Sequence, residues 1–72
     1  MEIERVEVTL KTCKNMTDQL ESLGANIITE KLGGHIVKKA QNGKGKTLFK
    51  AIINIEEALA RVSYPKGLFD RI

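Results

Sequence analysis

Apolar and polar residues alternate along the first segment of the chain. Residues 3–10 read IERVEVTL, and an extended conformation places Val6, Val8 and Leu10 on one side. The other side then carries charged and hydroxyl side chains. Because a period of two is typical of a strand with one buried face, the sequence predicts a strand here.

The period changes to that of a helix over the next segment. Residues 15–24 read NMTDQLESLG, with apolar residues at i, i+4 and i+7, namely Met16, Leu20 and Leu23. Asn15 is the expected N-cap, and Gly24 is the expected C-terminal glycine. A short helix is therefore predicted over this segment, with Cys13 just before it.

Two strand-like segments follow, joined by Gly33 and Gly34. They read NIITEKL and HIVKKA, and the Gly-Gly pair between them favours a two-residue hairpin turn, because glycine readily adopts the positive φ that such a turn needs. The facing of both strands is ambiguous because apolar residues are adjacent in each, at positions 27–28 and 36–37. Either a strand is covered on both faces, or a bulge shifts its register.

The next segments predict one more strand and a second helix. Residues 47–55 read TLFKAIINI, with one apolar face formed by Phe49, Ala51 and Ile53. Asn54 and Glu57 then occupy the positions of a capping box. An apolar stripe at helical spacing follows, made of Ile55, Ala58, Leu59 and Val62. We therefore expect a helix that begins after Asn54.

The predicted order is strand, helix, strand, strand, strand, helix. It predicts an α+β domain, a small antiparallel sheet of three to four strands with two helices on one face. Seventy-two residues make a single small domain, 1–72, in which residues 63–72 form a C-terminal tail. A chain of this size buries only about 60% of its unfolded surface. A homodimer is one way for it to bury more.

The stretch AQNGKGKT, residues 40–47, fits the loose form of a phosphate-binding loop. Such a loop follows a strand and leads directly into a helix, because the helix N-terminus and the loop amides together surround the phosphate. Here the segment after Lys46 alternates as a strand does, and the helix signal begins only at Asn54. We interpret the stretch as a lysine-rich hairpin turn and predict no nucleotide or other cofactor.

The chain offers few groups for catalysis or metal binding. It has one cysteine, Cys13, and one histidine, His35, and nothing in their spacing brings them together. A half-buried thiol and a histidine beside a turn are the alternative interpretations. No nucleophile, base and orienting group form a recognisable set. We predict that the chain is not an enzyme and holds no metal.

Positive charge gathers in the second half of the chain. Residues 1–36 carry six acids and four bases, whereas residues 37–72 carry eight bases and three acids, for a net charge of +3. Residues 38–50 contain five lysines and no acid: Lys38, Lys39, Lys44, Lys46 and Lys50. Such a patch attracts nucleic-acid phosphates or an acidic protein surface. The alternative is a solvated lysine-rich edge that prevents aggregation between sheets.

The tail carries the best candidates for contact with a partner. Aromatic side chains contribute much of the energy of protein interfaces, and the tail contains Tyr64, Leu68 and Phe69. The alternative is that the three residues pack on this domain's own core, because so small a core needs every apolar residue.

These features predict a small non-enzymatic protein-interaction module. A regulator or inhibitor of the kind that phages and mobile elements encode would act in this way, by occupying the surface of a partner protein. The alternative is a nucleic-acid-binding module that uses the lysine-rich hairpin 38–50.

The sequence also indicates where such a module acts. The acidic start MEIERVEV lacks the features of a signal peptide. No apolar run is long enough to cross a bilayer. Together with the single cysteine, these observations predict a cytoplasmic protein that does not contact the membrane.

Overall fold

The computed structural model describes residues 2–71 and contains one five-stranded sheet and one α-helix. In chain order the elements are β1 (Ile3–Thr9), α1 (Leu10–Ser22), β2 (Asn26–Leu32), β3 (His35–Gln41), β4 (Thr47–Asn54), β5 (Leu59–Pro65) and the short 3-10 helix η1 (Phe69–Arg71).

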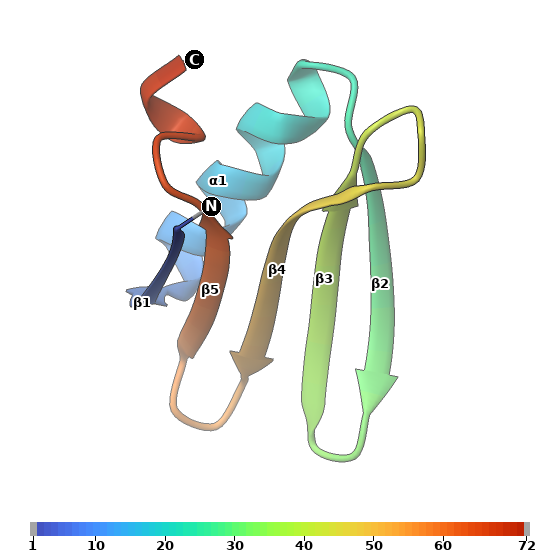
Figure 1. The fold of residues 1–72 in the computed structure, drawn as a ribbon. Helices are drawn as coiled ribbons and strands as arrows, with labels where there is room; N and C mark the ends of the chain where they lie inside the picture. The colour runs from blue at the N-terminus through green and yellow to red at the C-terminus, as the bar shows by residue number, and fades with distance from the viewer. Residues whose placement is uncertain (1, 72) are drawn as a thin grey trace.

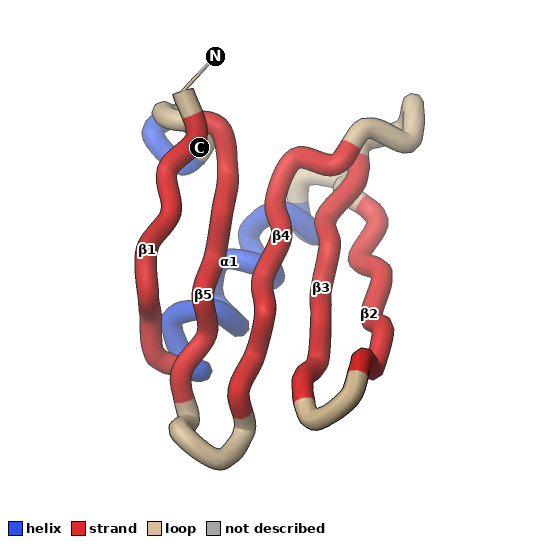
Figure 2. The backbone as a smooth tube through the Cα atoms, turned by 60° about the horizontal axis from the view of Figure 1, so that its bottom comes forward, coloured by secondary structure: helices blue, strands red, loops and turns tan. Residues whose placement is uncertain are grey.

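All neighbouring strands of the sheet are antiparallel, in the order β1-β5-β4-β3-β2. The last four strands follow one another as hairpins, and β1 pairs with β5, so the first and last strands lie side by side (Figure 1). The helix α1 crosses one face of the sheet and contacts strands from both edges (Figure 2). Within residues 2–71, no helix covers the opposite face of the sheet.

The predicted fold of three to four strands with two helices on one face is wrong, because the second helix is a strand. Residues 55–58 form the turn of a hairpin, and β5 follows it. The Asn54 Oδ1 atom does accept a hydrogen bond from the backbone N–H of Glu57, at 3.2 Å, as an N-cap would. Ala58 then adopts a φ of 55°, which reverses the chain in place of continuing a helix.

The helix α1 begins six residues earlier than predicted, since Asn15 was the expected N-cap. Its N-cap is Thr9, whose hydroxyl accepts a hydrogen bond from the backbone N–H of Thr12. Cys13 therefore lies within the helix, where it is buried. The prediction for the other end is confirmed, because the helix ends next to Gly24, which has a φ of 98°.

The two predicted hairpins are confirmed. The register of β2 and β3 joins Leu32 to His35 across the Gly33-Gly34 turn, and only Gly33 has a positive φ, as in a type II′ turn. The lysine-rich stretch joins β3 to β4, with a register shift between Ala40 and Gln41.

The core lies between α1 and the sheet. Three fully buried alanines on neighbouring strands, Ala40, Ala51 and Ala60, leave room for the helix. Larger buried side chains fill the remaining space, namely Cys13, Leu20, Phe49 and Val62.

Adjacent apolar residues in the strands are explained by two apolar faces. Ile27 pairs with Ala40 and packs against the core, so its neighbour Ile28 points away from the helix. Val37 and Ile52 pair with each other on that same outer side. The strands therefore carry apolar groups on both faces, and the register shift lies elsewhere.

Candidate functional site

The face of the sheet opposite α1, here called the uncovered face, carries side chains from all five strands. The strand register places Lys39 opposite Lys50, Lys50 opposite Ser63, and Ser63 opposite Arg5. We call these four residues the basic row. The next row along the strands consists of Glu30, Val37, Ile52, Arg61 and Glu7.

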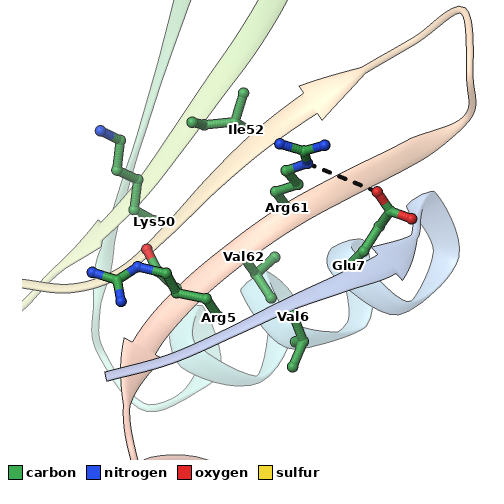
Figure 3. Close-up of a pocket in the computed structure, with 8 residues that line it drawn as sticks. Arg5, Val6, Glu7, Lys50, Ile52, Arg61 and Val62 are labelled. Atoms are coloured by element: carbon green, nitrogen blue, oxygen red, sulfur yellow. Dashed lines mark ion pairs between the residues drawn. The ribbon is translucent and has the colours of Figure 1, made fainter. Parts of the chain in front are cut away.

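A shallow hollow of about 620 Å³ lies over β1, β4 and β5, between side chains of the two rows. Its walls include the side chains of Arg5, Glu7, Lys50, Ile52, Arg61 and Ser63. Figure 3 shows Lys50, Ile52 and Arg61 standing on the same side of the sheet, whereas Val6 and Val62 point towards the helix. The hollow is therefore formed by the β4–β5 hairpin together with β1, which comes from the other end of the chain.

Positive charge exceeds negative charge in this hollow. Arg61 Nε lies 3.8 Å from Glu7 Oε2, and both side chains are more than half exposed. Among the described side chains, no ion pair involves Arg5 or Lys50. Lys39 is directly opposite Lys50, and its only described partner is Glu30, at 3.9 Å. Like charges opposed in this way destabilise a sheet unless an anion lies between them.

An apolar strip runs beside these charges. Val37 is only 5% exposed although it lies on the uncovered face, whereas Ile52 and Ile28 are 40% and 37% exposed. These three side chains belong to adjacent strands, β2, β3 and β4. The uncovered face thus combines an apolar strip with a cationic border.

A second, smaller hollow of about 260 Å³ continues the first towards the β4–β5 turn. It shares Glu7, Ile52 and Arg61 with the first hollow and adds His35 and Glu57. One end of the uncovered face is therefore basic, and the other end carries carboxylates.

Cys13 and His35 lie on opposite sides of the sheet. Cys13 belongs to the core beneath α1, whereas His35 is exposed and lines the second hollow. Burial raises the pKa of the Cys13 thiol, and the nearby Lys38 ammonium partly opposes this rise. Within residues 2–71, no three histidine, cysteine or carboxylate side chains are grouped so that they could hold a metal ion.

The five lysines predicted as one patch are divided among three places. Lys39 and Lys50 belong to the basic row, and Lys44 and Lys46 lie in the exposed β3–β4 turn. Lys38 pairs with the buried Ala51 and so lies on the helix side of the sheet. The five lysines therefore do not all lie on one face of the sheet.

The turn that resembles a phosphate-binding loop uses its own amides internally. The Asn42 Oδ1 atom accepts hydrogen bonds from the backbone N–H groups of Lys44, at 2.9 Å, and Lys46, at 3.0 Å. The strand β4 follows where a phosphate-binding loop needs a helix. The prediction of a hairpin turn at this stretch is confirmed.

The three predicted anchor residues of the tail pack against the domain's own core. Tyr64 belongs to β5, and its ring lies 4.9 Å from that of Phe69 at nearly a right angle. Phe69 is likewise perpendicular to Phe49, at 6.0 Å, and Leu68 contacts the same core. All three keep some exposure, and their contact with a partner stays a prediction.

The sequence did not point to Arg5, Ile52, Ser63 or Arg61 as site residues. Arg5 was expected on the exposed side of the first strand, Arg61 in a second helix, and Ser63 in the C-terminal tail 63–72. The adjacent apolar pairs in β2, β3 and β4 were the available signal, because they indicate strands with apolar groups on both faces.

No helix within residues 2–71 has the length and apolar character that a membrane crossing requires. Comparisons with known protein families, with curated proteins and with solved structures find no match to this chain.

Proposed function

We propose that this chain is a non-enzymatic protein-interaction module that acts by occupying a partner's surface with its uncovered face. The observation that carries the proposal is the pair of exposed side chains Ile28 and Ile52, which lie on either side of the nearly buried Val37 and beside a charged border. An apolar centre with a polar rim is the usual anatomy of a protein interface. A cytoplasmic regulator or inhibitor would act in this way.

The proposed interface lies on the sheet and not on the tail. Leu68 and Phe69 already contact this domain's own core, so binding through them would require that packing to open. Ile52 is exposed in the folded domain and needs no such rearrangement.

A nucleic-acid-binding function is the second candidate, and the basic row is the observation that favours it. One feature counts against it. All three aromatic rings lie in the cluster on the helix side, so the described part of the uncovered face has no platform on which bases could stack.

Site-specific crosslinking in the native host tests the proposed function. A photoreactive amino acid at position 52 should crosslink a discrete protein, and the same group at the exposed helix position Gln19 should not. Excess unlabelled wild-type chain should suppress the crosslink, whereas the Ile52→Ser variant should compete poorly. Identical crosslinks from both positions, or crosslinks to nucleic acid alone, would overturn the proposal.

A further inference from the structure

We infer that the partner presents an acidic, extended polypeptide segment, whose carboxylates bind between Arg5 and Lys50 while an apolar side chain packs on Ile52. This inference rests on the proposed function and specifies the chemistry of the partner.

Charge complementarity carries the inference. The first hollow gathers three cationic side chains, Arg5, Lys50 and Arg61, against one carboxylate, Glu7. Among the described side chains, Arg61 alone is paired with that carboxylate. The hollow therefore has an excess of positive charge. A carboxylate of the partner would reduce the repulsion between these cations and so bind favourably.

The spacing of the cations suits an extended peptide. Lys50, Ser63 and Arg5 lie on three adjacent strands, so the first and last backbone positions are about 10 Å apart. Two carboxylates that are two residues apart in an extended segment lie on the same side, separated by about 7 Å. Because arginine and lysine side chains are long, both cations can reach such a pair. The Ser63 hydroxyl stands between them as a further donor.

The exposed side chain of Ile52, next to the cations, favours an acidic peptide over other anions. Ile52 lies two residues after Lys50 on the same strand and the same face, and 40% of its surface is exposed. A phosphate backbone has no group to place there, whereas an acidic peptide with aliphatic residues does. The same exposed side chain predicts that a purely acidic peptide binds less tightly than an acidic one that contains apolar residues.

The test is fluorescence anisotropy with short labelled peptides and with the full chain. The probes are a peptide of alternating Glu and Val, its Gln and Val counterpart, an all-Glu peptide, and oligouridine RNA of the same charge. The charge-reversal variant is Arg5→Glu/Lys50→Glu. Its matched control is Lys44→Glu/Lys46→Glu, which changes the net charge equally at the exposed β3–β4 turn. Circular dichroism and thermal unfolding establish that both variants fold.

We expect the Glu-Val peptide to bind and its affinity to fall as salt rises. The Arg5→Glu/Lys50→Glu variant should weaken binding about tenfold or more, which corresponds to about 1.4 kcal/mol. The turn variant should change binding by less than about twofold, because its lysines lie outside the hollow. The single variant Arg5→Lys should retain most of the affinity.

Four results would overturn the inference. Equal losses in both double variants would show attraction by net charge alone. If the Gln-Val peptide bound as tightly as the Glu-Val peptide, the carboxylates would contribute nothing to binding. RNA that binds through Arg5 and Lys50 in place of the peptides would favour the second candidate function. Self-association in sedimentation that is lost with the Arg5→Glu/Lys50→Glu variant would show that a second copy occupies the face.

The two proposals fail separately. A specific crosslink from position 52 without binding of the acidic peptide would leave the interaction function standing and remove only the acidic partner. Loss of both results would remove both proposals.

Discussion

The two faces of the sheet carry different kinds of side chain. The helix side has small alanines beneath α1 and gathers all the aromatic rings around Phe49. The uncovered side has long charged chains beside branched aliphatic ones, with Ile52 40% exposed. Each strand contributes to both faces, because its side chains alternate.

The difference separates residues that hold the fold together from residues free to bind a partner. Phe49 and Val62 are buried by this domain alone, so their apolar surface stabilises the fold and is not available to a partner. Lys50 and Ile52 are neighbours of Ala51 in the same strand, but they face solvent and have unused charge and apolar surface. The following predictions test that separation, from the largest effect to the smallest.

Substitution of Phe49 by alanine should damage the helix side most. The ring is 1% exposed and lies 6.2 Å from Tyr64 and 6.0 Å from Phe69. Its removal should lower the free energy of unfolding by about 3–5 kcal/mol, through lost burial and the cavity that remains. Urea denaturation measures this loss.

The matched control on the other face is Ile52→Ala, which should cost about 1 kcal/mol or less, because this side chain is partly exposed. If the two variants lost equal stability, the uncovered face would be as important to folding as the core, and our separation of the faces would be wrong.

Substitution of Ala58 by glycine should stabilise the protein by about 1 kcal/mol. Ala58 has a φ of 55°, a conformation that costs a residue with a Cβ atom about 1–2 kcal/mol and costs glycine little. In a helix the same change would instead destabilise by about 1 kcal/mol. The sign of the change in thermal unfolding therefore decides whether β5, which supplies Arg61 and Ser63 to the uncovered face, exists in solution.

The segment around Ala58 also shows what the sequence could and could not predict. An asparagine whose side chain bonds the N–H group three residues later occurs both in helix caps and in turns, so Asn54 and Glu57 did not distinguish them. Residues 59–64 also alternate, with Ala60, Val62 and Tyr64 towards the core. That alternation indicated a strand, and pairing with β1 and β4 made it one.

Local features were predictable where turn chemistry decides the structure. Gly24 and Gly33 both have positive φ at the places where their sequence context predicted a helix end and a hairpin. The hollow was not predictable, because Arg5 meets Ser63 only through the pairing of β1 with β5, and because the segment that contains Arg61 was predicted to be a helix. Local periodicity showed which side chains share a face in β1 and β4, but not which strands are neighbours.

Substitution of Lys50 by glutamate should stabilise the fold while it weakens binding. The new carboxylate would lie directly opposite Lys39 and one strand from Arg61, so a repulsive pair becomes an attractive one. We expect a gain of about 0.2–1 kcal/mol at low salt, which added salt should reduce. Thermal unfolding over a salt series measures this gain in stability.

The control Lys44→Glu, in the exposed turn, should leave the melting temperature nearly unchanged. A loss of stability in Lys50→Glu would show that the basic row carries no unbalanced charge.

The smallest effect concerns the buried thiol and appears only at alkaline pH. Burial beneath α1 raises the pKa of Cys13 above its ordinary value of 9.0, so the folded protein keeps its thiol proton after the unfolded chain has lost it. The unfolded state then binds fewer protons, and the free energy of unfolding falls as the pH rises above about 9. At neutral pH both states are protonated, and the thiol contributes no pH dependence. The informative quantity is the difference between the wild type and Cys13→Ala in urea denaturation at successive pH values, because it isolates the contribution of the thiol. That difference should shrink above pH 9 and stay constant below pH 8.

Because the Lys38 ammonium lowers the pKa of the thiol, Lys38→Met should raise that pKa and make the alkaline loss of stability steeper. A constant difference up to pH 10 would mean that Cys13 ionises as easily in the folded protein as in the unfolded chain, which would place it outside the core that separates the two faces.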